Sequence, residues 1–214
     1  AFFMLTGELM TSATITDRLV ALSRALIGRI RGGLAQVNVL VSMFFAGMNG
    51  SVVADTATVG ALVLPAMKKA GYPAAFSAAV TGVSSTIGGI IPPSIMMIVL
   101  ANSTEISIAA LFAAGIVPGI LIGVVIMIIN HYFAIKYNFE RSDQPFSIRR
   151  AGKELYRSSF ALLIPLVLVG SVMGGVASVV EAGAITAMVA LFTGVFVYRT
   201  IKWKECTGAF RRAF

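Results

Sequence analysis

The side chains best suited to chemistry lie at two interruptions of an otherwise apolar sequence. The first is the Asn49-Gly50-Ser51 stretch, which is followed closely by Asp55, and the second runs from Ser84 to Ser94. Hydroxyl, carboxylate and carbonyl oxygens are hard ligands that suit Na⁺, whereas free amide groups at the start of a helix suit an anion. The candidate Na⁺ ligands are Asn49, Gly50, Ser51, Asp55, Ser84, Ser85, Thr86 and Gly88, and the candidate anion contacts are Pro92, Pro93 and Ser94.

Backbone chemistry predicts that the second interruption breaks a helix. Pro92 and Pro93 lack amide hydrogens and disfavour the α conformation in the residue before each, while Gly88 and Gly89 readily take positive φ. The uncharged run from Pro73 to Thr104 is long enough to span a bilayer, so the break is expected at membrane depth. Backbone groups that are freed there must line a cavity or bind a ligand.

Asp55 is the sharpest single candidate. Insertion scales give a carboxylate at membrane depth a cost of about 2.5 to 3.5 kcal/mol, so such a residue is usually retained for a purpose. The simpler alternative is that Asp55 only interacts with the positive N-terminal end of the helix that follows Ser51. Hydroxyl groups in membrane helices likewise often bond their own backbone four residues earlier. The sequence leaves both alternatives open.

Composition predicts an integral membrane protein. The 214 residues are 57% hydrophobic and 12% charged, whereas about 25% of residues are charged in soluble proteins. The net charge of +8 comes from basic residues in short segments between apolar runs, which follows the positive-inside rule and argues against nucleic-acid binding. The sequence shows no nucleophile–base set, phosphate loop or transition-metal cluster, so we expect neither an enzyme nor an organic cofactor.

Hydropathy and charge divide the chain into segments that cross or line the membrane. Length alone does not separate two short crossings from a second hairpin in the last apolar block. The predicted order is the end of a transmembrane helix (1–14), an amphipathic cytoplasmic surface helix (15–31), a re-entrant hairpin (32–71), a broken transmembrane helix with an outer loop (72–110), a transmembrane helix (111–135), a basic cytoplasmic loop (136–157), two short transmembrane helices (158–198) and a basic cytoplasmic segment (199–214).

The hairpin is predicted from length and turn chemistry. Residues 32–67 contain a single charge, yet they are too long for one crossing and too short for two. Asn-Gly is a strong turn signal and Ser51 is a favourable N-cap, so the turn is predicted between Gly47 and Ser51. Basic residues at both ends, such as Arg31 and Lys68, place those ends in the cytoplasm and the turn deep in the membrane.

These motifs resemble the large membrane subunit of tripartite ATP-independent periplasmic (TRAP) transporters. Two positions depart from the usual pattern: Asn49 stands where the family often has Ser, and Val179-Val180-Glu181-Ala182 stands where it usually has Pro-Thr-Glu-Ala. Such a subunit is longer, so we expect this chain to be its middle portion. The motifs that carry the resemblance are Gly32-Gly33-Leu34-Ala35, the stretch from Phe45 to Asp55, the stretch from Met67 to Tyr72, the stretch from Ser84 to Ser94, and the stretch from Leu111 to Gly119.

The resemblance implies a polytopic all-α fold that forms one half of an inverted-repeat, elevator-type transporter, with a re-entrant helical hairpin and a broken transmembrane helix. It implies Na⁺-coupled import of organic anions, such as sialic acids or C4-dicarboxylates, across the bacterial or archaeal cytoplasmic (inner) membrane. The implied partners are a periplasmic substrate-binding protein, a small membrane subunit that is separate or fused, the organic anion and membrane lipid. A second hairpin and a second broken helix would follow Phe214, and 158–198 would form two spanning helices.

Three other functions remain open at this stage. A divalent-anion sodium symporter shares the architecture but needs no binding protein. A channel needs an aqueous pore, and a non-transporting scaffold subunit would not respond to Na⁺. The sequence does not decide which organic anion is carried.

Overall fold

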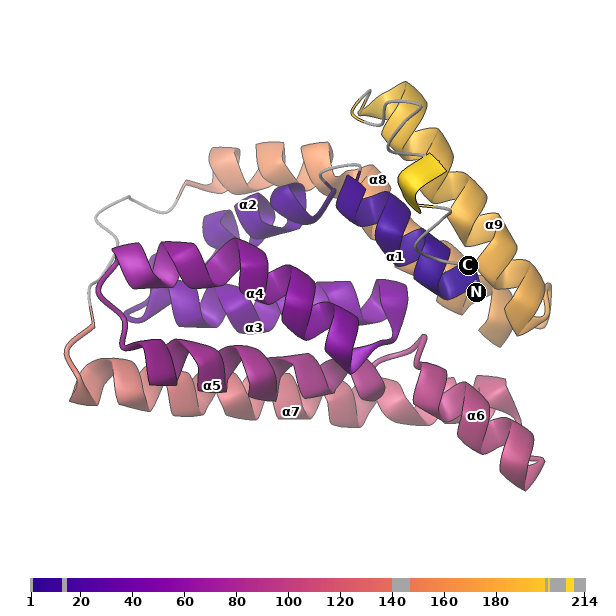
Figure 1. Ribbon diagram of the computed structural model, residues 1–214, viewed down its shortest axis with the longest axis horizontal. Helices are drawn as coiled ribbons and strands as arrows, with labels where there is room; N and C mark the ends of the chain where they lie inside the picture. Colours follow the sequence, from indigo (N-terminus) through magenta and orange to yellow (C-terminus); the bar gives the residue numbers. More distant parts are fainter. Residues whose placement is uncertain (1, 13–14, 140–146, 199, 201–206, 210–214) are drawn as a thin grey trace.

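The structure describes residues 2–12, 15–139, 147–198, 200 and 207–209, and most of these residues are helical. This computed structural model contains no strand within those ranges, which confirms the all-α prediction. The elements are α1 (Phe2–Ser12), α2 (Ile15–Ile27), α3 (Gly33–Asn49), α4 (Val52–Lys69), α5 (Ala74–Ser85), the 3₁₀-helix η1 (Thr86–Gly89), α6 (Ile95–Thr104), α7 (Ile108–Lys136), α8 (Ile148–Met173), α9 (Val179–Phe192) and the π-helical turn η2 (Thr193–Val197) (Figure 1).

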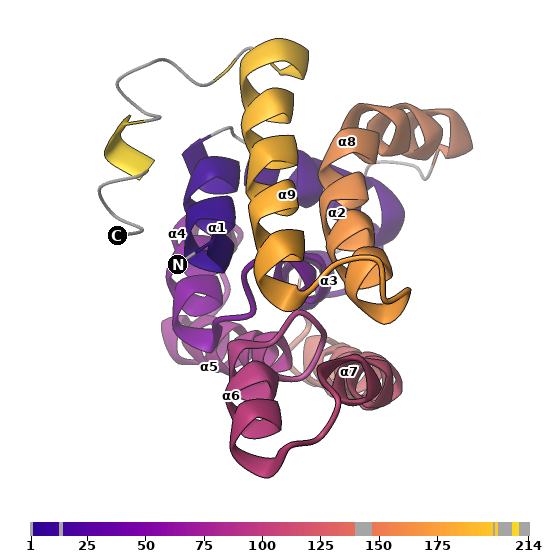
Figure 2. The same ribbon diagram turned by 90° about the vertical axis from the view of Figure 1, so that its right-hand side faces the viewer.

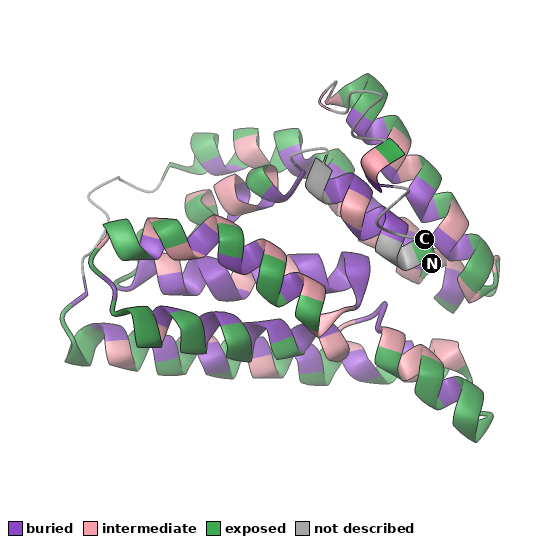
Figure 3. Ribbon diagram, viewed as in Figure 1, coloured by how far each residue is buried: buried purple, intermediate pink, exposed green. Residues whose placement is uncertain are grey.

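The helix α3 occupies the centre of the molecule. It packs against α1, α2, α4, α5, α7 and α8, and most of its residues are buried (Figure 3). Val37, Val41, Phe45 and Met48 recur at helical spacing and are fully buried. The buried residues of α3 lie on all of its sides, as expected for a helix in the interior of a protein. Because α3 is held from several directions, its C-terminal end is fixed in place inside the protein.

Three helices are long and apolar enough to cross a membrane: Ile108–Lys136, Ile148–Met173 and Val179–Val197. At 1.5 Å per residue, the 29 residues of α7 cover about 44 Å, against a hydrocarbon core of about 30 Å. One side of α7 exposes Val117 and Leu121, while the other side packs against α3, α5 and α6. An exposed apolar side on a helix of this length suits lipid. The chain is therefore a multi-pass membrane protein.

The amphipathic helix α2 is shorter than predicted and packs differently. It ends at Ile27 rather than at residue 31, because the chain turns at residues 28–32, where Gly32 has φ +74°. The predicted apolar face, including Ile15, Leu19 and Leu22, is buried, and the helix packs against α3 and α8 (Figure 2). The first part of its apolar side is therefore covered by protein, whereas Leu26 and Ile30, which the prediction placed on the same side, are exposed.

Two contacts attach α2 to the C-terminal helices. The Arg18 guanidinium lies 3.9 Å from the centre of the Tyr198 ring, which is within cation–π range. The Ser158 hydroxyl donates to the backbone carbonyl of Arg18 across 3.3 Å. Since α2 also packs against α3, it connects the hairpin to α8 and to Tyr198, which follows η2.

The helix α8 begins inside the segment that was predicted as a basic loop (136–157). The Ser147 hydroxyl accepts a hydrogen bond from the Arg150 amide at 3.4 Å, and the helix runs from Ile148 to Met173. Its basic residues Arg149, Arg150 and Lys153 are exposed, so a helical turn accommodates them without burying charge. The prediction of a loop as far as 157 is therefore wrong. Residues 140–146 and most of the basic segment 199–214 lie outside the described residues.

Candidate functional site

The two interruptions of the sequence lie against each other. We call Asn49–Ser51 the hairpin tip and residues 86–94 the break. The backbone amide of Ile95, which follows the break, donates to the carbonyl of Gly50 across 3.2 Å. A Cβ at Gly88 would lie 3.7 Å from the carbonyl carbon of Ser51. The structure therefore brings the hairpin tip and the break into direct contact, near the start of α6 (Figure 1).

Local sequence explains the shape of the hairpin tip. The helix α3 continues to Asn49, so the turn is tighter than the predicted span from Gly47 to Ser51. Gly50 then adopts a left-handed conformation with φ +59°, which glycine tolerates without steric cost. The Ser51 backbone amide donates to the Asn49 side-chain oxygen at 3.1 Å, and the Ser51 hydroxyl accepts from the amide of Ala54 at 3.4 Å. Ser51 is thus the N-cap of α4, as its residue type predicts.

The break has the predicted order of helix, irregular segment and new helix. After α5 ends at Ser85, the chain forms one 3₁₀ turn over Thr86–Gly89, and α6 begins only at Ile95. The Ser94 hydroxyl donates to the carbonyl of Gly89 at 2.8 Å and accepts from the amide of Met97 at 3.3 Å. Ser94 therefore closes the break and caps α6 at the same time.

A buried polar network connects α3 with α5 beside this contact. The Asn38 side-chain amide donates to the Thr81 hydroxyl at 2.7 Å, and the Ser84 hydroxyl donates to the Asn38 carbonyl oxygen at 3.3 Å. The hydroxyl oxygens of Ser42 and Ser84 lie 3.2 Å apart. All four residues are buried. Buried polar groups that satisfy one another in this way fix the relative position of the two helices.

Asp55 is fully buried, with 0% of its surface exposed, in the first turn of α4. The Ser42 and Ser85 hydroxyl groups approach its carboxylate. Among the described residues, however, neither carboxylate oxygen has a partner that meets hydrogen-bond geometry. A buried carboxylate without a partner costs several kcal/mol, and a bound cation would offset that cost. The buried amide nitrogen of Asn49 likewise has no partner in the described part of the chain.

The structure brings most of the predicted site residues to the contact or its lining and leaves one of them, Thr86, apart from it. Ser85 is buried but donates to the carbonyl of Thr81 at 2.8 Å, which is the ordinary intrahelical bond of a membrane serine. Thr86 is exposed, and its hydroxyl donates to the carbonyl of Val83. It therefore lies apart from the cluster. The residues that the structure brings to the contact or its lining are Asn49, Gly50, Ser51, Asp55, Ser84, Ser85, Gly88, Pro92, Pro93 and Ser94.

Sequence reasoning did not identify Asn38 and Ser42 as members of the cluster. Both lie on α3, four residues apart, and Asn49 follows eleven residues after Asn38, so the three share one face of the helix. This spacing of polar residues in an apolar helix is the signal that could have found them. Glu181, whose role the sequence left undecided, is exposed and forms a capping box with Ser178 at the start of α9. A capping box is sufficient to explain this acid.

Helix ends give the contact its electrostatic character. The C-terminal ends of α3 and of the α5–η1 segment present carbonyl oxygens, whereas the N-terminal ends of α4 and α6 present amide groups. Carbonyl ends attract cations and amide ends attract anions. Together with the buried Asp55 carboxylate, the arrangement can hold a cation and an organic anion near each other.

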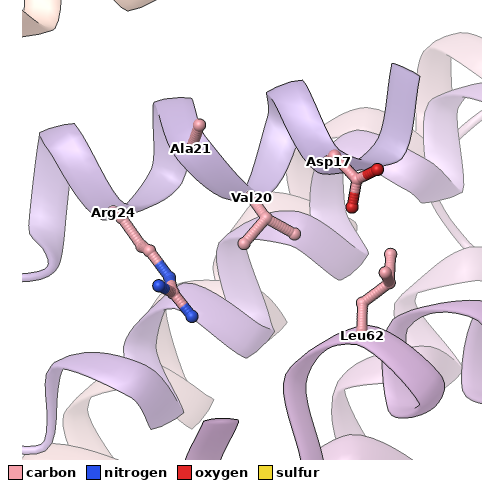
Figure 4. A pocket seen from close by; sticks show the side chains of 5 residues that line it. All are labelled: Asp17, Val20, Ala21, Arg24 and Leu62. Carbon is pink, nitrogen blue, oxygen red and sulfur yellow. The ribbon is translucent and has the colours of Figure 1, made fainter. Parts of the chain in front are cut away.

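A separate open groove of about 280 Å³ lies between α2 and α4. Asp17, Val20, Ala21 and Arg24 line one side and Leu62 lines the other (Figure 4). It shares no lining residue with the hairpin tip or the break. We therefore do not include it in the candidate site.

Comparison with known proteins identifies the family. A family model described as the tripartite ATP-independent periplasmic transporter, DctM component, matches residues 1–214. The chain belongs to this family. The resemblance read from the sequence motifs is thereby confirmed, and the DctM family places the protein in the bacterial inner membrane as a multi-pass subunit.

Three curated relatives illustrate the similarity. The chain is 37% identical to the C4-dicarboxylate TRAP transporter large permease protein DctM of Pseudomonas aeruginosa, covering 96% of this chain and 48% of the relative. It is 36% identical to the sialic acid TRAP transporter large permease protein SiaM of Vibrio cholerae, covering 94% and 47%. It is 37% identical to the 2,3-diketo-L-gulonate TRAP transporter large permease protein YiaN of Escherichia coli, covering 97% and 50%. The chain spans about half the length of these relatives.

Proposed function

We propose that this chain is part of a secondary transporter that uses the Na⁺ gradient to import organic anions delivered by a periplasmic binding protein. The observation that carries the proposal is the contact between the hairpin tip and the break, closed by the hydrogen bond from Ile95 to Gly50. Transporters of this general kind bind ions and substrate where interrupted helices meet. Family membership and the names of the three relatives support the same function.

In this proposal, Na⁺ binds among oxygen atoms of the hairpin tip and the first half of the broken helix. Asp55 supplies negative charge, because it is fully buried and its oxygens lack partners among the described residues. The hydroxyl groups of Ser51 and Ser84 and the backbone carbonyl groups near Gly88 supply neutral ligands. The organic anion meets the N-terminal end of α6. Within the Pro92–Ser94 segment the two prolines lack amide hydrogens and the Ser94 hydroxyl is engaged with Gly89, so the Ser94 backbone amide donates to the anion.

The remaining parts of the proposal concern the complete transporter. The hairpin and the broken helix form half of a domain that moves against the other helices by an elevator mechanism, and the rest of the ion and substrate site lies outside this chain. A small membrane subunit, separate or fused, and a periplasmic binding protein complete the assembly. The carried anion is a carboxylate such as a C4-dicarboxylate, a sialic acid or another sugar acid, as the relatives' names suggest. The family match does not favour a symporter that works without a binding protein.

The test is Na⁺-dependent uptake by the full-length large subunit, reconstituted in vesicles with its small subunit and binding protein. Asp55→Asn should raise the Na⁺ concentration for half-maximal uptake about tenfold or more, since a hydrogen bond or ligand contact to a charged group contributes about 1.5 to 3 kcal/mol. Thr56→Val is the matched control, because Thr56 is the next residue, is exposed, and donates its hydroxyl to the Val52 carbonyl of its own helix. Its Na⁺ dependence should equal that of the wild type.

A binding measurement completes the test. Na⁺ should raise the thermal stability of the wild-type complex relative to K⁺, by about 2.7 kcal/mol at a concentration 100 times the dissociation constant. Asp55→Asn should lose most of this increment. An Asp55→Asn variant with wild-type Na⁺ dependence in both assays would remove Asp55 from the site. Uptake without the binding protein would favour the rival symporter.

A further inference from the structure

The helix α7 approaches the break unusually closely on the side opposite the hairpin tip. A Cβ at Gly115 would lie 2.4 Å from the carbonyl oxygen of Ile90 and 2.5 Å from the terminal methyl of Met97. A Cβ at Gly119, one turn later, would lie 2.4 Å from a side-chain carbon of Ile91. Real side chains do not approach within such distances. Glycine therefore allows the backbone of the break to rest directly on α7.

The hairpin tip holds the same segment from its other side. The Gly50 carbonyl accepts the hydrogen bond from Ile95, and a Cβ at Gly50 would lie 2.2 Å from the carbonyl oxygen of Pro93. The chain from Ile90 to Ile95 is thus enclosed between two glycine contacts, one on α7 and one on the hairpin. On both sides the contact involves backbone atoms, which cannot rotate away as a flexible side chain can.

We infer that Gly115 is a positioning residue: it sets where the Ile90–Ile95 segment lies, and thereby keeps the start of α6 within hydrogen-bonding distance of the hairpin tip. The inference rests on the proposed function, because its consequence for transport is exerted through the ion and anion site at that contact. A methyl group at position 115 must displace the Ile90 carbonyl, and Ile95 lies only five residues farther along. The Ile95–Gly50 hydrogen bond is the contact with the hairpin tip that this displacement weakens.

The decisive experiment uses Gly115→Ala in the full-length subunit, with Gly123→Ala and Gly82→Ala as controls. The three atoms nearest to a Cβ at Gly123, two turns later on α7, all belong to the flexible side chain of Met43, and a Cβ at Gly82 would meet nothing within 4 Å. Amide hydrogen exchange at Ile95 should accelerate about five- to tenfold in Gly115→Ala, the change expected from weakening one hydrogen bond. Both controls should retain the wild-type exchange rate.

Transport provides the second measurement. Gly115→Ala should raise the Na⁺ concentration for half-maximal uptake by a similar factor, with a smaller effect on the maximal rate. The double variant Gly115→Ala with Met97→Ala should stay impaired, because the clash with the Ile90 carbonyl remains. If Gly115→Ala does not fold, Gly119→Ala should give a smaller shift of exchange at Ile95 in the same direction.

Unchanged exchange at Ile95 in a folded Gly115→Ala protein would overturn the inference, and so would full recovery in the double variant. Failure of the proposed function is a separate result. It would appear as wild-type uptake that does not depend on Na⁺, whereas the exchange measurement at Ile95 tests the positioning role without any assumption about the coupling ion.

Discussion

Substituting Gly50 with alanine perturbs the contact between the hairpin tip and the break at its narrowest point. Gly50 has φ +59°, and its added Cβ would lie 2.2 Å from the carbonyl oxygen of Pro93 and 3.1 Å from the Ile95 amide nitrogen. Gly71, at the end of α4, is the matched control. It has φ +79°, the same left-handed region, but nothing lies within 4 Å of its Cβ position.

The expected magnitudes follow from this comparison. A left-handed conformation costs an alanine about 1 to 2 kcal/mol, and both variants pay this cost. Gly50→Ala also weakens the Ile95–Gly50 hydrogen bond, at about 0.5 to 1.5 kcal/mol, and overpacks a buried contact, at about 1 to 3 kcal/mol. The change in the entropy of the unfolded chain is shared and cancels in the difference. Gly50→Ala should therefore destabilise the protein by about 2 to 4 kcal/mol more than Gly71→Ala.

The assay is denaturant or thermal unfolding of each variant in the same detergent, together with Na⁺-dependent uptake in vesicles. Gly50→Ala should unfold at a clearly lower temperature than Gly71→Ala and should lose most uptake, whereas Gly71→Ala should keep it. Equal destabilisation of the two variants would refute the reasoning, because it would mean that backbone conformation alone, and not the close approach to Pro93, accounts for the glycine at position 50.

Two further predictions concern the polar groups around the contact. Asn38→Leu should lower the free energy of unfolding by about 1 to 3 kcal/mol, because it removes two buried hydrogen bonds, one to Thr81 and one to Ser84. Asn102→Leu, at an exposed position, should change it little, and comparable unfolding midpoints for the two variants would contradict this. Ser51→Ala and Ser107→Ala each remove an N-cap hydrogen bond of 3.4 Å, so each should lower the free energy of unfolding by about 0.5 to 2 kcal/mol. Only Ser51→Ala should also change the Na⁺ dependence of uptake. A similar change in Ser107→Ala would argue for a purely structural effect.

The elements around the site were predictable because their signals are local. Proline, glycine and a capping hydroxyl act on the backbone within a few residues, so the break near Pro92 and Pro93 and the turn at Gly50 could be derived directly from the sequence. The N-cap function of Ser51 follows from the same rules. Such signals give no distance between two interruptions, so placing ligands from both in one Na⁺ site was a hypothesis, and the structure shows that the two interruptions are in contact.

The parts that sequence reasoning missed depend on packing between distant segments. Asn38 and Ser42 appear unremarkable within an apolar helix until α5 brings Thr81 and Ser84 beside them. The first turns of α8 were predicted as a loop because they carry several basic residues. That reasoning did not consider that a helix can place these residues on an exposed face. The apolar face of α2 was assigned to the membrane surface, since no local signal shows that α3 and α8 cover it.

The bond between Ile95 and Gly50 joins main-chain atoms only, so alanine scanning would leave it intact at Ile95 and could mistake the junction for an inert stretch. A library of side chains at position 95 leaves the backbone donor of this hydrogen bond in place. Replacing the Ile95 amide with an ester by chemical or expanded-code synthesis deletes the donor and keeps every side chain, so it would test this one hydrogen bond without the steric change that Gly50→Ala and Gly115→Ala introduce.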